Sequence, residues 1–282
     1  MPSPPVLTAQ QFNKIQTLVY EKCGIDLKNG KEELVKARLG KELRKRNLSS
    51  FDGYIREVEN DRTGEALIQL INALSTNFTH FFRESKHFDI LRNNVAPGWS
   101  SGKQIHIWCA AASTGEEPYS ILLSLLEELG PAAPLRLLAS DISTRALATA
   151  QEGIYPEERV SEIPRAMLSR YFLRAVRNQE VLYRVKPEVR QMLEFRRINL
   201  IEPISHSRQF QTIFCRNVMI YFDKPTQQKV VAQLTEWLEP GGYLFVGHAE
   251  SLNAVRHSLQ YVAPAVYRKP VSGVTMQERR VG

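Results

Sequence analysis

The first third of the chain has the hydrophobic spacing of amphipathic helices. Apolar residues recur every three or four positions through residues 8–95, as expected where one face of each helix is buried. The first such segment follows Thr8, whose hydroxyl suits a helix N-cap, and its apolar positions are Phe12, Ile15, Val19 and Cys23. A second stripe consists of Val35, Leu39 and Leu43. The pattern predicts an all-helical region followed by a connecting helix that stops near Pro97.

The spacing changes near residue 104. Short apolar runs such as 105–110, 135–141 and 210–215 then alternate with helical stretches. Alternating strands and helices predict right-handed crossovers and a mostly parallel sheet covered by helices on both faces. We therefore expect a Rossmann-like, doubly wound α/β fold, interrupted between residues 155 and 197 by a small β excursion.

These patterns divide the chain into successive parts. We expect a small helical domain over residues 1–75, a connecting segment and helix over 76–96, and an α/β domain over 97–270. The α/β domain would include a small β subdomain near residues 170–196. The polar last segment, 271–282, is expected to be mobile.

The segment WCAAASTGEEPYS, residues 108–120, would join the first strand of the sheet to the next helix. In an open parallel sheet the ligand crevice lies at the carboxyl ends of the strands, so small residues over 111–117 keep side chains away from a bound cofactor. A helix N-terminus that binds phosphate is free of negative charge, but Glu116 and Glu117 stand here. A carboxylate suits a cation or a hydroxyl-rich group instead, although both glutamates could simply favour the helix N-terminus.

Asp141 ends the next predicted strand, one strand–helix unit after this loop. Rossmann-type sites place an acid there to bond ribose hydroxyls. Asp141 could equally be the N-cap of the helix that starts near Thr144. The loop, Glu116 and Asp141 together favour an adenosine-type cofactor, and these residues alone leave both NAD and S-adenosylmethionine open.

Net charge, cysteine content and hydropathy indicate the kind of partner and the cellular compartment. The formal net charge of +7 favours an acidic partner. Three cysteines, Cys23, Cys109 and Cys215, are too few and too widely spaced for a disulfide framework and fit a reducing cytoplasm. No apolar run reaches the roughly 18–20 residues needed to cross a bilayer, so we expect no direct membrane insertion.

Several motifs resemble the signatures of one family, the CheR-type chemotaxis receptor methyltransferases. The matching motifs are TNFTHFFRE (76–84), AAASTGEEPYS (110–120), ASDIS (139–143), INL (198–200) and FCRNVMIYFD (214–223). The resemblance runs in order through residues 10–268. It implies an S-adenosylmethionine-dependent protein-glutamate O-methyltransferase, with S-adenosylhomocysteine as product. The implied substrate is the cytoplasmic helical bundle of methyl-accepting chemoreceptors.

The resemblance also implies the cofactor contacts. By position these are Asn77, Thr79, Arg83, Glu116, Asp141, Asn199, Leu200, Arg216 and Asn217. Our hypothesis is that Arg83 holds the cofactor's carboxylate and that Glu116 faces its cationic end. Asp141 would then bond the ribose, and Asn199 would read the adenine edge. Arg83 could instead be a surface cation, and Asn199 and Asn217 could be turn residues.

The implied reaction needs little acid–base catalysis. A glutamate side chain, with a reference pKa of about 4.3, is already ionised at neutral pH. Positioning of the acceptor and exclusion of water can supply the catalysis. We therefore predict no catalytic triad and no metal. Tyr221 is a candidate for the substrate channel, with a core position as the alternative, while His248 is interpreted as structural and Cys109 as a packing residue.

The second predicted helix carries a candidate docking face, formed by Arg38, Lys41, Arg44 and Lys45. Such a face could be merely solvated, could bind nucleic-acid phosphates, or could steer an acidic protein helix to the site. The resemblance favours the last of these. We therefore expect a chemoreceptor as partner, no nucleic acid, and a monomeric cytoplasmic enzyme.

Other functions stay open on the residues alone. A basic, non-catalytic adaptor could retain a degenerate nucleoside-binding fold. NAD-linked redox chemistry is disfavoured by the loop 111–117, which has small residues but only one glycine, and by Glu116, which would lie beside the pyrophosphate. Some family members grip a receptor tether with a glycine-containing loop in the small β excursion. The comparable stretch here, 171–185, has no glycine, which puts tether binding in doubt.

Overall fold

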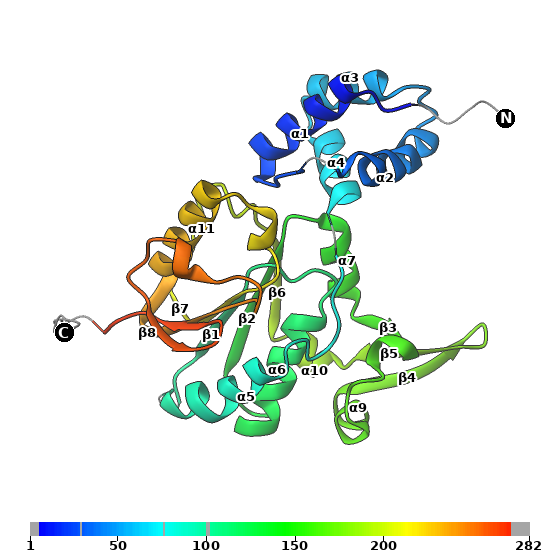
Figure 1. Ribbon diagram of the computed structural model, residues 1–282. Helices are drawn as coiled ribbons and strands as arrows, with labels where there is room; N and C mark the ends of the chain where they lie inside the picture. Colours follow the sequence, from blue (N-terminus) through cyan, green and yellow to red (C-terminus); the bar gives the residue numbers. More distant parts are fainter. Residues whose placement is uncertain (1–5, 29, 76, 100–101, 272–282) are drawn as a thin grey trace, which may run out of the picture.

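The computed structural model describes residues 6–28, 30–75, 77–99 and 102–271. In Figure 1 a bundle of helices forms a separate upper unit, and an α/β unit lies beneath it. The predicted tail, 271–282, lies outside the described residues apart from Val271.

The upper unit consists of α1 (Ala9–Cys23), α2 (Glu32–Lys45), α3 (Phe51–Asn60) and α4 (Glu65–Leu74). The predicted N-cap is confirmed, because the Thr8 side chain accepts from the backbone N–H of Gln11 and the Gln11 side chain accepts from that of Thr8. Both predicted apolar stripes are buried in a single core. Burial of these stripes, more than helix propensity, stabilises the short helices.

The connection to the sheet is less regular than the predicted helix. It contains α5 (Lys86–Ile90), a π-helical turn over Leu91–Val95 and a 3₁₀ turn over Ala96–Gly98. Residues 77–85 precede these turns without regular structure. That irregular backbone matters because it carries Asn77, Thr79 and Arg83 to the edge of the sheet.

The main sheet confirms the doubly wound, mostly parallel α/β fold. Its order is β6-β2-β1-β7-β8-β10-β9; the first five strands run parallel, and β10 is antiparallel to both its neighbours. The strands are β1 (Ile105–Cys109), β2 (Leu135–Asp141), β6 (Leu193–Arg197), β7 (Phe210–Cys215), β8 (Leu238–Val246), β9 (Gln260–Ala263) and β10 (Val266–Arg268).

Helices cover both faces of this sheet. The core on one face includes α6 (Glu116–Leu129) and the connecting segment, and the core on the other includes α11 (Lys224–Trp237). α7 (Thr144–Glu152) links β2 to the small β sheet and contacts α4 of the upper unit. Short 3₁₀ turns cover Met219–Tyr221 and Leu252–Ala254. No helix among the described residues is long and apolar enough to span a membrane.

The β excursion differs from the prediction in one strand. A separate antiparallel sheet contains β3 (Ile154–Pro156), β5 (Glu180–Val185) and β4 (Phe172–Arg177), in that order, and is flanked by α8 (Glu157–Val160), α9 (Arg165–Tyr171) and α10 (Pro187–Arg190). Leu193–Arg197 does not belong to it, because this strand pairs with β2 as the parallel edge strand of the main sheet. Alternating local sequence could not show which neighbour a strand selects.

The β4–β5 hairpin turns tightly without glycine. Asn178 and Gln179 adopt positive φ values of 48° and 66°, and the strands pair up to Arg177 and Glu180. Two successive positive φ values are typical of the hairpin turn that matches strand twist, and Asn tolerates this conformation well. The missing glycine therefore does not prevent a tight turn in this hairpin.

Candidate cofactor site

A cavity opens at the carboxyl edge of the parallel strands. Its wall is formed by residues that follow β1, β2, β6 and β7, by the irregular segment 77–83, and by α1, α2 and the loop between them. The predicted site residues in this wall are Asn77, Thr79, Arg83, Asp141, Asn199, Leu200, Arg216, Asn217 and Tyr221. The fold thus brings together side chains from separate parts of the chain. Glu116 is not part of the wall, and Glu117 is.

The loop after β1 is held in one conformation by close packing. Gly115 has a φ of +101°, and a Cβ there would lie 2.6 Å from the Tyr155 hydroxyl oxygen and 2.9 Å from the Ala150 Cα. The Tyr155 hydroxyl donates to the Thr114 carbonyl at 2.8 Å. The single glycine of the motif is therefore required by both backbone conformation and space.

Replacing Gly115 with alanine should lower the free energy of unfolding by about 2–3 kcal/mol, because the new methyl group is both strained and overpacked. Urea denaturation measures the loss. Gly98→Ala is the matched control, since a Cβ at Gly98 would meet nothing within 4 Å. Equal stability of the two variants would contradict this account of the loop.

Asp141 occupies the position expected for a ribose-binding acid. Its Oδ2 accepts from the Ser113 N–H at 2.8 Å and its Oδ1 from the Ser143 N–H at 2.9 Å. The N-cap of α7 is Ser143, whose side chain accepts from the Ala146 N–H, so the capping alternative for Asp141 is wrong. Burial raises the pKa of Asp141, and the backbone donors from Ser143 and Ser113 oppose that shift.

The two adjacent glutamates have different surroundings. Glu116 is fully buried away from the cavity, where its carboxylate accepts from Thr114 Oγ1 at 2.7 Å and pairs with Arg159 of α8. Glu117 lines the cavity and accepts from Arg216 Nη1 at 2.8 Å. Successive helical residues point about 100° apart, so one helix start cannot aim both acids at one ligand. Helical periodicity alone could not say which of the two faces inward.

Arg216 joins the sheet to the connecting segment. Arg216 is 3% exposed. Its guanidinium pairs with Glu117 Oε2 at 2.8 Å and with Glu84 Oε2 at 3.0 Å. It also donates to the Arg83 carbonyl, so it fixes the backbone beside another predicted contact. Burial acts to raise the pKa of Glu84, but the charge of Arg216 together with the hydrogen bonds from Arg216 and Asn217 outweighs burial and holds that pKa below its usual value.

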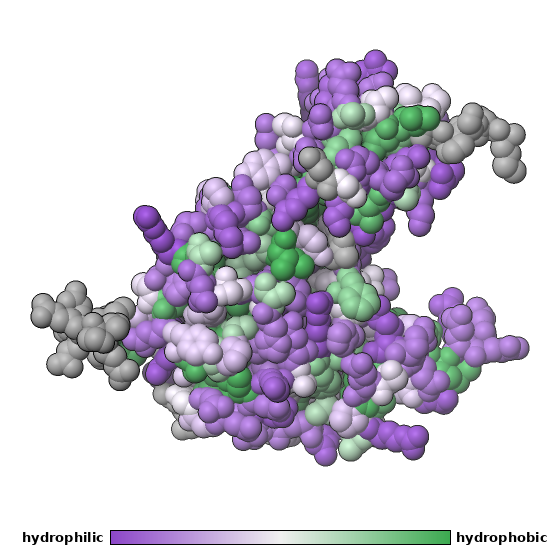
Figure 2. Space-filling view, in the orientation of Figure 1, coloured by the Kyte–Doolittle hydropathy of each residue, from purple (hydrophilic) through white to green (hydrophobic). Residues whose placement is uncertain are grey.

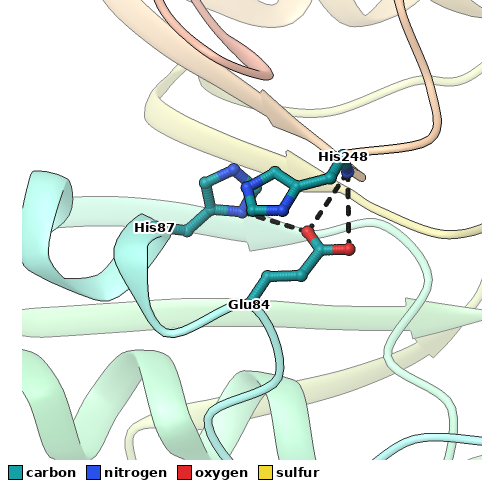
Figure 3. A group of neighbouring side chains, drawn as sticks. All are labelled: Glu84, His87 and His248. Carbon is teal, nitrogen blue, oxygen red and sulfur yellow. Dashed lines mark hydrogen bonds and ion pairs between the residues drawn. The ribbon is translucent and has the colours of Figure 1, made fainter.

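Figure 3 shows how Glu84 meets His87 and His248. The three side chains offer ligand atoms that lie within 4.8 Å of one another. Burial and the neighbouring Arg216 lower the pKa of His87 to about 4, so this imidazole is neutral at pH 7. Because the Arg216 guanidinium already lies on the Glu84 carboxylate, a metal cation is electrostatically disfavoured. We interpret the cluster as the anchor of Arg216.

Asn199 and Tyr221 lie where the upper unit meets the sheet. The Asn199 amide donates to the Lys22 carbonyl and to Glu202 Oε1, both at 2.8 Å, while the Tyr221 carbonyl accepts from the Asp26 N–H at 2.8 Å. The Asn199 amide hydrogens are therefore engaged with protein partners, and its carbonyl oxygen lies 3.4 Å from the Ile201 N–H. These bonds fix the helical unit over the cavity.

The predicted docking residues divide into two groups. Lys41, Arg44 and Lys45 are exposed on α2. Arg38 is half-buried and donates to the Leu74 and Ser75 carbonyls at the end of α4, which gives it a role in packing α2 against α4.

Sequence reasoning missed several groups in the cavity wall. Lys31 and Leu34 reach it from the start of α2, and Phe78, 73% exposed, reaches it from the connecting segment. An apolar residue between two motif positions, as in Asn77-Phe78-Thr79, was the available signal for Phe78. Nothing in the local spacing indicated that α2 would border a site built on the sheet.

The polar groups of the cavity fit one cofactor class. Asp141 presents a carboxylate suited to hydroxyl donors, and Glu117 places a second acid at the start of α6, where a phosphate binder needs free N–H groups. Acids at both positions suit a nucleoside that carries a cation and no phosphate. Fold and site together define a Rossmann-like methyltransferase that uses S-adenosylmethionine.

Comparisons with known proteins identify the family. The SAM-binding domain of the CheR methyltransferases matches residues 77–267, and their all-alpha domain matches residues 10–75. The chain therefore belongs to the CheR methyltransferase family. It is 40% identical to chemotaxis protein methyltransferase 2 of Pseudomonas aeruginosa, covering 92% of this chain and 93% of that one. It is 38% identical to the chemotaxis protein methyltransferase of Escherichia coli, covering 93% and 91%. The identity to that of Borreliella burgdorferi is 36%, covering 93% and 95%.

Proposed function

We propose that the chain methylates glutamate side chains on the cytoplasmic helical bundle of chemoreceptors and so forms glutamyl methyl esters. The relatives' names support a chemotaxis role. The observation that carries the proposal is the placement of α2. This helix contributes Lys31 and Leu34 to the cavity wall and exposes Lys41 and Lys45 further along its length. One helix therefore connects a basic surface to the mouth of the cofactor cavity.

The shape of the molecule supports the same substrate. In Figures 1 and 2 the helical unit and the small β sheet project from the same side of the α/β unit and leave a notch between them. A helical bundle approaching through this notch would meet the basic residues of α2. Opposite charge steers such an encounter and raises its rate. We propose that the enzyme acts on it as a monomer in the cytoplasm.

The residues of the site bind and orient more than they exchange protons. Bound S-adenosylmethionine supplies a methyl group activated by its sulfonium. The acceptor carboxylate is already ionised at neutral pH, so no base is required. In this proposal Asp141 binds the ribose, Arg83 holds the cofactor's carboxylate, and Tyr221 borders the acceptor. Phe78 at the rim shields the reacting atoms from water.

Transfer of labelled methyl groups tests the substrate. The chain is incubated with methyl-tritiated S-adenosylmethionine and a purified chemoreceptor cytoplasmic fragment, and base-labile radioactivity is counted. We expect label that disappears when the receptor's exposed glutamates become alanine. Cofactor binding measured by calorimetry without any labelling of the receptor would overturn the substrate and keep the cofactor site.

Reversing charge on α2 should weaken substrate binding selectively. In the Lys41→Glu/Lys45→Glu variant we expect KM for the receptor fragment to rise by about three- to tenfold with little change in kcat. The reason is that these residues attract the substrate during association and do not contact the reacting atoms. The effect should shrink as salt is raised. The matched control is Lys14→Glu/Lys229→Glu, which makes the same charge change at exposed residues of α1 and α11. Equal KM values for both variants would show that only net charge matters.

A further inference from the structure

A second cleft lies near the amino ends of β1 and β7, whereas the cofactor cavity lies at the carboxyl ends of the parallel strands. It is lined by the amino-terminal halves of β1 and β2, by β6 and the turn before it, and by the loop that leads into β7, and its volume is about 680 Å³. Among the described residues, none lines both this cleft and the cofactor cavity. Concave sites of about 300–1,000 Å³ are typical of small-molecule binding. The cleft is therefore large enough to hold a ligand of its own.

The lining of this cleft is basic. Arg136, Arg196 and Arg208 contribute three guanidinium groups, and Glu194 is the one carboxylate among the described lining residues. Glu194 pairs with Arg196. Arg136 donates to the carbonyl of the preceding residue at 3.1 Å, and Arg208 Nη1 lies 3.3 Å from His106 Nε2. In the described part of the chain neither Arg136 nor Arg208 forms an ion pair with a carboxylate.

Two histidines of the lining respond to this positive charge. Burial lowers the pKa of His106, and the charges of Arg208 and Arg136 lower it further. Burial and the charge of Arg196 lower the pKa of His206 to about 4. Both imidazoles are therefore neutral at pH 7, and each keeps one N–H that can donate to an anion.

His206 is also held rigidly and lacks a polar partner. Its ring lies 4.8 Å from the ring centroids of both Trp108 and Trp237 and 5.1 Å from that of Phe210. Its Nε2 atom is buried and has no hydrogen-bond partner among the described residues. A buried polar atom without a partner is costly, so this wall of the cleft holds a hydrogen-bonding group whose needs the described residues do not meet.

We propose that this cleft binds a small anion that carries two or more phosphoryl groups. The planar guanidinium fork matches phosphate oxygens. Two such forks come from the arginines without carboxylate partners, Arg136 near the start of β2 and Arg208 in the loop before β7, on the two strands that flank β1. A single carboxylate would leave most of this positive charge uncompensated. The site lies outside the methyl-transfer cavity and does not depend on the substrate proposed above.

Isothermal titration calorimetry of the full-length protein with sodium pyrophosphate tests the proposal. We expect a single saturable site whose dissociation constant rises by about tenfold or more in the Arg136→Gln/Arg208→Gln variant, because two charge-assisted contacts are lost. The two arginines are exposed, so the variant should melt at the wild-type temperature. Arg196→Gln provides an independent variant at the third guanidinium. Saturating S-adenosylhomocysteine should leave pyrophosphate binding unchanged.

Further measurements distinguish binding at this cleft from nonspecific attraction to positive charge and from binding of other ligands. Arg62→Gln, an exposed arginine of the helical unit, makes the same charge change per site and should bind pyrophosphate as the wild type does. ATP should bind at least as tightly as pyrophosphate, and adenosine should not bind this cleft. The proposal is overturned by absence of saturable binding, by equal weakening in Arg62→Gln, by competition with S-adenosylhomocysteine, or by tighter binding to duplex DNA than to pyrophosphate.

Discussion

Replacing Arg216 with methionine should lower the free energy of unfolding by about 3–5 kcal/mol at pH 7, because it leaves charged partners buried without compensation. Arg216 is paired with Glu117 Oε2 at 2.8 Å and Glu84 Oε2 at 3.0 Å, and the Glu117 side chain is 9% exposed. Methionine keeps much of the length of the side chain and removes the charge. Urea denaturation at constant m-value measures the loss.

The pH dependence of this loss identifies its cause. Arg216 holds the pKa of Glu84 below its usual value, so the stability that this pairing contributes is present at neutral pH and is lost as pH falls through that lowered pKa. The difference between wild type and Arg216→Met should therefore shrink as pH is lowered towards 4. Burial raises the pKa of Glu117, and Arg216 opposes that shift, so without Arg216 this carboxyl should become neutral at a higher pH.

A surface ion pair provides the control for this variant. Arg46 pairs with Glu57, whose side chain is 40% exposed, so Arg46→Met should cost no more than about 1 kcal/mol. A loss in Arg216→Met that is equally small, or independent of pH between 4 and 8, would contradict the role assigned to the buried pairings.

Replacing Asp141 with asparagine should weaken S-adenosylmethionine binding by roughly 10- to 150-fold, the equivalent of about 1.5–3 kcal/mol for hydrogen bonds to a charged group. Asparagine has nearly the same shape, but it loses the charge and one of the two acceptors now used by the Ser113 and Ser143 N–H groups. Calorimetry measures the dissociation constant, and a melting curve shows how much of the change is a loss of fold.

The control for Asp141 is the nearby buried acid that does not line the cavity. Glu116→Gln removes a carboxylate held by Thr114 and Arg159, and the dissociation constant for S-adenosylmethionine should stay within about threefold of the wild-type value. An effect of Glu116→Gln as large as that of Asp141→Asn would show that Glu116 contacts the cofactor, as first expected from its place in the motif.

The pH dependence of cofactor binding follows from the same carboxylate. Because burial raises the pKa of Asp141, this group becomes protonated at a higher pH than an exposed aspartate as the solution is acidified. Affinity should therefore fall as pH is lowered through that raised pKa and should be flat above it. In Asp141→Asn this fall should be smaller, and what remains should come from Glu117, the other cavity acid whose pKa burial raises.

The motif assigned the cofactor contact to Glu116, whereas tertiary packing buries Glu116 outside the cavity wall and places Glu117 in it. Motif order placed the site residues on strand ends and loops, and the parallel fold then brought those ends to one edge. The direction of each side chain depends on partners that are distant in sequence, such as Arg159 for Glu116 and Arg216 for Glu117. Local spacing carries no information about such partners.

The sequence by itself determined the helical unit, the parallel sheet, the family motifs and the acid that ends β2, because apolar periodicity and turn chemistry are local properties. Only the tertiary structure decided that Leu193–Arg197 joins the main sheet, that Arg38 packs against the end of α4, and that α2 borders the cavity. It also gathered Arg136, Arg196 and Arg208 around one cleft. Each of these arrangements depends on contacts between residues far apart in the chain, which strand pairing and core packing set together.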